Sequence, residues 1–248
     1  MTEIVRVSND GPIRTIQMNR PDKKNALTMP MYTAMAEAIE TAGDSVHCFL
    51  ITGSSGAFSA GNDLQDFRNA AQAGEGLADP VLRFLYALAR SERPIVAAVE
   101  GLAVGIGTTM LLHCDYVVAS SDARFSTPFV QLGLVPEAAS SLLMPGLMGH
   151  RRAFSLLVMG RAMDAEAALA AGLVNAVVAA PEVLSEAIKA ARDIAALPPE
   201  AVAASRRLMR GSPADIVSRI DEEAAVFKTR LQSPAARAAF EAFFQRRR

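Results

Sequence analysis

The segment that decides the fold spans residues 95–112 and reads IVAAVEGLAVGIGTTMLL. It is long and apolar enough to imitate a membrane-spanning helix. However, Glu100 and three glycines interrupt it, and a charged side chain inside a bilayer is costly. We therefore predict a buried strand over 95–99, a glycine-rich turn, and a buried helix over 106–112.

Strand-like and helix-like segments alternate on both sides of this segment. Short apolar runs predict buried strands at 48–52 and 116–119. Apolar residues at helical spacing predict helices at 30–41 and 80–90. Alternation of this kind indicates a largely parallel sheet whose strands are joined by helical crossovers.

The two ends of the chain follow different patterns. Two strand-like segments, 4–7 and 13–18, flank a turn sequence near the N-terminus and predict a β-hairpin. After about residue 140 the pattern becomes mainly helical, with one strand-like piece at 174–178. We expect one α/β domain with a helical C-terminal part. The helix-like segments of that part are 150–159, 164–171, 181–196, 199–210 and 214–231.

Composition and charge exclude several classes of function. Of the 248 residues, 51% are hydrophobic, and the net charge is −1, which argues against a nucleic-acid-binding surface. Cys48 and Cys114 lack the spacing of zinc ligands, so we expect no metal site. We expect a cytoplasmic protein because cysteines are few and residues 1–4 lack the features of a signal peptide. The basic residues 246–248 are either a solvated tail or a phosphate contact.

Three loops carry residues that could take part in binding or catalysis. Residues 53–64 read GSSGAFSAGNDL and residues 101–110 read GLAVGIGTTM; both loops follow a predicted strand. Small residues let a ligand approach backbone N–H groups closely, so the two loops form either plain turns or an oxyanion hole. The second loop lacks the GxGxxG spacing of a dinucleotide site. In the third loop, PFVQLGLVPEAASS at 128–141, Glu137 is either capped and structural, exposed, or raised in pKa for proton transfer.

Six pieces of the sequence occur in the order that one family shows. The chain resembles the crotonase (enoyl-CoA hydratase/isomerase) superfamily over most of its length. The resemblance implies a crotonase-like ββα spiral core over 1–195 and a C-terminal helical trimerisation region over 196–248. It also implies a homotrimer or a dimer of trimers. The pieces are NRPDKKNAL at 19–27, FSAGNDL at 58–64, RPIVAAVEGLAVGIG at 93–107, CDYVVASSDARFSTPF at 114–129, LGLVPEAASS at 132–141 and AAGLVNAVV at 170–178.

The resemblance implies an acyl-CoA substrate and assigns roles to individual residues. The backbone N–H groups of Ala60 and Ile106 would hold the thioester oxygen in an oxyanion hole. Coenzyme A enters as part of the substrate, and no separate cofactor, metal or membrane is required. The residues expected to bind the acyl-CoA are Lys24, Ala60, Gly61, Asn62, Asp63, Leu64 and Ile106.

The departures from the family pattern bear on the reaction. Typical hydratases of the family carry two glutamates, which would fall at Thr109 and Phe129, and neither position is acidic here. Glu137 matches the single glutamate of the Δ3,Δ2-enoyl-CoA isomerase branch, so we predict that it shuttles the proton. A hydratase, another crotonase-type reaction and a non-catalytic scaffold or binding protein are the alternatives. His113 is expected to be structural, and Asp115 to cap or pair in the core.

Overall fold

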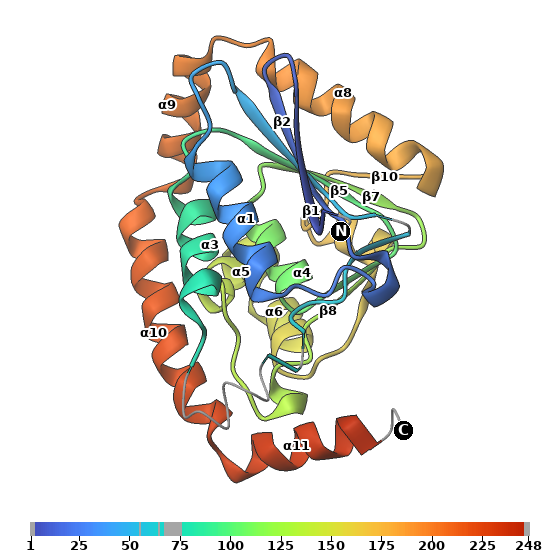
Figure 1. Ribbon diagram of the computed structural model, residues 1–248, viewed down its shortest axis with the longest axis vertical. Coiled ribbons are helices and arrows are strands. Elements are labelled where there is room, and N and C mark those ends of the chain that lie inside the picture. Colours follow the sequence, from blue (N-terminus) through green and yellow to red (C-terminus); the bar gives the residue numbers. More distant parts are fainter. Residues whose placement is uncertain (1–2, 55, 64, 67–75, 246–248) are drawn as a thin grey trace.

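The computed structural model describes residues 3–54, 56–63, 65–66 and 76–245, and Leu64 lies outside them. A six-stranded sheet runs through the upper part of the molecule in Figure 1. Its strand order is β1-β2-β3-β5-β7-β10. β1 pairs antiparallel with β2, which confirms the predicted hairpin, and the remaining pairs are parallel. The strands are β1 (Val5–Asp10), β2 (Ile13–Met18), β3 (Cys48–Thr52), β5 (Ile95–Val99), β7 (Tyr116–Ser120) and β10 (Ala176–Val178).

A second sheet of short strands lies beside the first. Three of its strands each follow a strand of the large sheet: β4 follows β3, β6 follows β5, and β8 follows β7. This repeated step from one sheet to the other confirms the predicted α/β fold with a ββα spiral core. The sheet has the order β4-β6-β8-β9, formed by β4 (Ala57–Ser59), β6 (Leu102–Val104), β8 (Arg124–Ser126) and β9 (Met163–Asp164).

Alternate residues of the central strands face opposite layers of helices. Cys48 and Leu50 of β3 pack with helix α8 (Val183–Ala195). Phe49 and Ile51 instead belong to the larger core that includes α1 (Met29–Glu40) and α3 (Asp79–Arg90). Because successive strand side chains point to opposite faces, a strand covered on both faces is apolar throughout. This explains why residues 48–51 of β3 and all of β5 are apolar.

The helices after residue 140 lie around the core, with α9 at the upper end of Figure 1 and α11 at the lower end. α10 packs beside α3, and α11 extends across the lower end of the molecule (Figure 1). Among the described residues, no helix is both long and apolar enough to cross a membrane. These helices are α5 (Ser140–Met148), α6 (His150–Leu157), α7 (Ala165–Ala170), α9 (Pro199–Arg210), α10 (Pro213–Leu231) and α11 (Pro234–Gln245).

An ion pair joins α9 to the large sheet. Arg206 is only 9% exposed, and its Nε lies 2.8 Å from both carboxylate oxygens of Asp115. Asp115 also accepts a hydrogen bond from the Ile95 N–H, at 2.8 Å. The prediction that Asp115 forms a pair is therefore confirmed, but the pair lies at the edge of the core, because Asp115 itself is exposed. The predicted boundary between 1–195 and 196–248 coincides with the end of α8 and stays a prediction.

Candidate active site

The two glycine-rich loops lie against each other at the ends of parallel strands. β4 pairs with β6, with Ser59 opposite Ala103, so the loops that leave their carboxyl ends are neighbours. A Cβ atom added at Gly61 would lie 2.6 Å from the Val104 carbonyl oxygen. A Cβ at Gly107 would lie 2.8 Å from the Ser59 carbonyl oxygen. The backbones therefore approach as closely as glycine alone permits.

The backbone N–H of Ala60 is already occupied. It donates to the carbonyl oxygen of Lys24 at 2.8 Å. On the same side, the Leu27 N–H donates to Gly61, and the Asp63 N–H donates to Leu27. The prediction that the Ala60 N–H is free to bind an oxyanion is therefore contradicted by its hydrogen bond, which ties the first loop to residues 24–27.

Two other N–H groups at this place have no acceptor among the residues that the structure describes. One is the N–H of Asn62, which lies between residues that pair with Leu27. The other is the N–H of Ile106, the first residue of helix α4 (Ile106–Thr109). First-turn amides of a helix lack an intrahelical acceptor. Gly105, the residue before Ile106, has φ 56° and ψ −120°, a conformation available to glycine.

Asn25 organises the first loop, and sequence analysis missed it. Its side chain donates to the carbonyl oxygens of Ala57, at 2.7 Å, and Ser54, at 3.1 Å. The Ser59 hydroxyl donates to the Asn25 carbonyl oxygen and accepts from the Gly61 N–H. Asn25 has φ 54°, a left-handed conformation that asparagine tolerates better than most residues. The residue type itself, an asparagine where the chain turns, is the only local feature of the sequence that could have indicated this role.

The charged residues predicted to bind the substrate lie at the outer side of this loop. Asp63 forms an ion pair with Arg20 at 2.8 Å and accepts a hydrogen bond from the Gln65 N–H at 3.1 Å. Its carboxylate therefore fixes the loop in this structure. Lys24 is exposed and follows a short 3-10 helix, Pro21–Lys23. The substrate-binding roles of Lys24, Gly61, Asn62 and Asp63 stay predictions.

Glu137 is brought to the second loop from a distant part of the chain. Its side chain is fully buried, and the Thr109 hydroxyl lies 2.5 Å from its Oε1 atom. Its Oε2 atom has no hydrogen-bond partner among the described residues. Burial raises the pKa of Glu137 to about 8; the Thr109 hydrogen bond opposes this shift, and the charge of Glu223 adds to it. Glu137 therefore carries a proton more readily than an ordinary carboxyl group.

Thr109 and Phe129 occupy the positions where sequence analysis found the expected acids missing. Thr109 lies on α4, three residues after Ile106, and Glu137 reaches its hydroxyl group from another loop. Phe129 is buried, and its ring lies 4.0 Å from the place of a Cβ on Gly105. One position is thus a hydrogen-bond partner of the buried carboxyl group, and the other is an apolar wall.

Tyr32 of α1 also belongs to this site, although in the sequence it looks like a core residue. Its side chain is fully buried, and its hydroxyl donates to Asn62 Oδ1 at 2.5 Å. Burial raises the pKa of Tyr32 well above its ordinary value, and the charges of Glu137 and Asp66 add to this. Tyr32 therefore stays protonated and holds the Asn62 side chain by a hydrogen bond.

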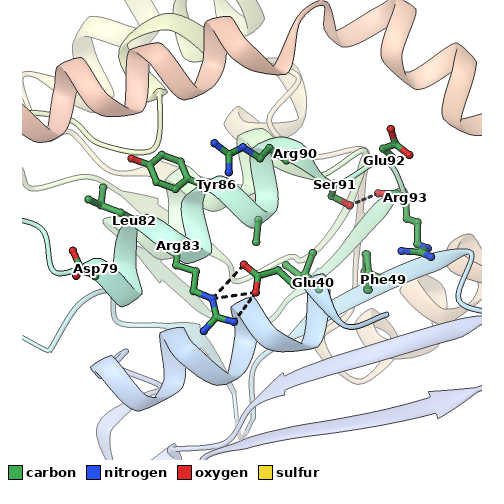
Figure 2. A pocket seen from close by; sticks show the side chains of 12 residues that line it. Glu40, Phe49, Asp79, Leu82, Arg83, Tyr86, Arg90, Ser91, Glu92 and Arg93 are labelled. Atoms are coloured by element: carbon green, nitrogen blue, oxygen red, sulfur yellow. Dashed lines mark hydrogen bonds and ion pairs between the residues drawn. The ribbon is translucent and has the colours of Figure 1, made fainter. Parts of the chain in front are cut away.

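A cavity lined by described residues lies away from these loops. It has a volume of about 690 Å³ and opens between α1 and α3 (Figure 2). Figure 2 shows Arg83 directed at Glu40, with which it pairs at 2.6 Å. None of the predicted site residues lines this cavity. Within the described part of the chain, no group of three or more His, Cys, Asp or Glu side chains is placed to hold a metal ion.

A family model and solved structures point to the same family of proteins. The model of a family described as enoyl-CoA hydratase/isomerase matches residues 9–248. The solved structure of Pseudomonas aeruginosa OdaA is 45% identical to this chain, with a TM-score of 0.92; the match covers 98% of this chain and 99% of that one. A structure of an enoyl-CoA hydratase/isomerase from Pseudoalteromonas atlantica T6c is 41% identical, also with a TM-score of 0.92, and the match covers 98% of each chain.

Two curated relatives carry different reaction names. Enoyl-CoA delta isomerase 2 of Rattus norvegicus is 37% identical over 224 residues, which is 88% of this chain and 57% of the relative. The chain thus spans little more than half the length of that relative. Enoyl-CoA hydratase AFT3-1 of Alternaria alternata is 35% identical over 248 residues, covering 96% of this chain and 84% of the relative. The relatives therefore share a family but not a single named reaction.

Proposed function

Because the chain belongs to the enoyl-CoA hydratase/isomerase family, we propose that it is an enoyl-CoA isomerase with a single glutamate as proton shuttle. The substrate is a 3-enoyl-CoA thioester, and the product is the conjugated 2-enoyl-CoA. The observation that carries the proposal is the buried carboxyl group of Glu137, which has a raised pKa and one oxygen atom without a hydrogen-bond partner in the described part of the chain. A carboxyl group in such surroundings is suited to proton transfer near neutral pH.

The thioester oxygen binds to two backbone N–H groups, those of Asn62 and Ile106. Asn62 takes the place first predicted for Ala60, because the Ala60 N–H is bound to Lys24. Removal of a proton from C2 places negative charge on the thioester oxygen, and preorganised donors stabilise that charge. One donor of this kind contributes about 3 kcal/mol to the stability of the transition state.

Glu137 moves the proton. Its carboxylate removes a proton from C2, and the dienolate that forms spreads its charge from the thioester oxygen to C4. The protonated Glu137 then returns the proton to C4, which leaves the double bond between C2 and C3. Hydration would need a second acid–base group to activate water, and Thr109 and Phe129 stand where hydratases of the family carry their glutamates.

We expect kcat/KM to rise with pH until Glu137 is ionised. Only the carboxylate can accept the proton from C2, and burial raises the pKa of Glu137 to about 8 in the free protein. The acidic limb of the profile should therefore have its midpoint near pH 8, well above that of an ordinary carboxyl group. Initial rates measured from about pH 6 to about pH 10 test this. A midpoint near pH 4 to 5 would contradict a buried base.

The function is tested by assays with a 3-enoyl-CoA and a 2-enoyl-CoA. Appearance of the conjugated thioester from the first substrate, without addition of water to the second, supports the isomerase. Hydration of the 2-enoyl-CoA without conjugation of the 3-enoyl-CoA would establish the hydratase instead. The Alternaria relative is named for that reaction. Tight binding of both thioesters without turnover would indicate a binding protein.

We also propose that the protein is a cytoplasmic homotrimer, or a dimer of trimers, that needs no cofactor beyond the coenzyme A of its substrate. The region 196–248 would contribute to the contacts between subunits. Leu208 and Met209 on α9 support this, because their side chains are 85% and 86% exposed, and adjacent exposed apolar side chains mark contact surfaces. Light scattering that gave the mass of a monomer would contradict the oligomer.

A further inference from the structure

The two residues that follow Glu137 adopt an unfavourable backbone conformation. Ala138 has φ 62° and Ala139 has φ 56°, so both lie in the left-handed region. For an L-residue other than glycine, this conformation costs about 1–2 kcal/mol per residue. Such strain persists only where surrounding contacts impose it, and it concentrates at functional sites. The conformation of Ala138 and Ala139 sets the direction in which Glu137 leaves the backbone.

Glu223 of α10 supplies one of these contacts. It is only 6% exposed, and its Oε2 accepts a hydrogen bond from the Ala139 N–H at 2.6 Å. Its Oε1 accepts from both the N–H, at 2.9 Å, and the hydroxyl of Ser141. Both carboxylate oxygens are thus used at the start of α5. A helix is usually capped by the residue that precedes it, but Ala139 has no side chain able to do so.

His113, at the end of a 3-10 helix (Met110–His113), supplies a second contact. Its Nε2 lies 2.9 Å from the Ala138 carbonyl oxygen, so Nε2 must carry a hydrogen atom and donate it. The imidazole is fully buried; burial, and then the charge of Arg210, lowers the pKa of His113 to about 4. His113 is therefore a neutral donor with a fixed tautomer over the range in which the protein works.

We propose that Glu223 and His113 are positioning residues for Glu137. They hold the peptide groups of Ala138 and Ala139 in the left-handed conformation and thereby keep the Glu137 carboxyl group against Thr109. This inference rests on the proposed function, in which Glu137 carries the proton. Displacement of a reacting group by about 1 Å can lower a rate by about a hundredfold, so the loop needs such support.

The Glu223→Gln variant tests the contact with α10, with Glu222→Gln as its control. Glutamine offers one acceptor oxygen and an NH₂ group, so the N–H of either Ala139 or Ser141 loses its acceptor. Glu222 lies next to Glu223, is exposed and pairs with Arg219. Its replacement makes the same change in charge but leaves the Glu223 carboxylate as acceptor for the loop, to which Glu222 is linked only through Arg219 among the described residues. We expect Glu223→Gln to lower kcat about tenfold or more with KM changed less than about twofold, and Glu222→Gln to match the wild type.

The pH profile gives a second readout of the proximity of Glu223 to Glu137. The charge of Glu223 adds to the rise in the pKa of Glu137. Its removal should therefore shift the acidic limb of kcat/KM to lower pH, whereas Glu222→Gln should leave the limb in place. Tyr32, the other titratable group facing Glu137, stays neutral in both variants because burial raises its pKa.

The pair His113→Phe and His113→Gln tests the second contact independently. Phenylalanine fills the space but cannot donate to Ala138, whereas glutamine restores a donor. We expect a lower kcat in His113→Phe and partial recovery in His113→Gln. Crystal structures of the variants report the separation of Glu137 from Thr109, and a carboxyl titration followed by NMR reports the pKa of Glu137. If the wild type does not isomerise a 3-enoyl-CoA, the proposed function is overturned. The two measurements still test the positioning role in that case, because neither depends on turnover.

The positioning role is overturned if folded Glu223→Gln and His113→Phe both keep the kcat and the pH profile of the wild type. It is equally overturned if their crystal structures keep Ala138, Ala139 and Glu137 in place. If Glu223→Gln does not fold, the His113 pair decides the question.

Discussion

Glu137→Gln should lower kcat for conjugation of a 3-enoyl-CoA by about a thousandfold, while KM changes by less than about twofold. Glutamine has nearly the shape of the protonated carboxyl group and can still accept a hydrogen bond from Thr109. It cannot take a proton from C2, so the chemical step is lost while the thioester still binds. The measurement is the rise in absorbance of the conjugated thioester, with the purified variant and the wild type side by side.

The stability of the same variant provides its control. The pKa of Glu137 is raised from 4.5 to about 8 by folding, so the wild type loses stability as the pH rises from about 4.5 through about 8. Glutamine carries no such penalty. Glu137→Gln should therefore melt at a higher temperature than the wild type near pH 9, and at a similar temperature near pH 4. An inactive variant with this profile is folded, and full activity of such a variant would refute the role of Glu137.

The parts of the fold that sequence could predict are those with strong local patterns. The strands at 48–52 and 95–99 are correct to the residue because both faces are covered, so every position but Thr52 is apolar. The second sheet was missed because its strands have only two or three residues, too few to display an alternation. Helix α5 was missed because it contains Pro145 and takes its cap from Glu223 rather than from a neighbouring residue.

The residues of the candidate site also differ in whether a local sequence pattern reveals them. Glu137 could be singled out because a carboxyl group stands alone among apolar and small residues. Tyr32 could not, because it occupies the buried face of a helix, where a tyrosine looks like core. The error at Ala60 has a geometric cause. Sequence indicates which loop approaches the substrate, but not which N–H points outward, and that choice depends on the φ of 84° at Gly61 and on the hydrogen bond to Lys24.

Gly61→Ala should affect both the rate and the stability, because Gly61 is where the two glycine-rich loops touch. A Cβ atom there would lie 2.6 Å from the Val104 carbonyl oxygen, and the φ of 84° disfavours any side chain. The clash must push the loop carrying the Asn62 N–H away from the loop carrying the Ile106 N–H. Loss of one donor to the thioester oxygen predicts a fall in kcat/KM of about a hundredfold or more.

Gly11→Ala separates the clash from backbone strain. Gly11 has φ 55°, in the turn between β1 and β2, and a Cβ atom there would meet nothing within 4 Å. It should therefore cost about 1 kcal/mol of unfolding free energy, from strain alone, and leave kcat/KM unchanged. Denaturant unfolding and steady-state rates of both variants make the comparison. If Gly61→Ala is destabilised no more than Gly11→Ala and keeps the kcat/KM of the wild type, the contact between the two loops does not build the oxyanion hole, and the donors must be sought elsewhere.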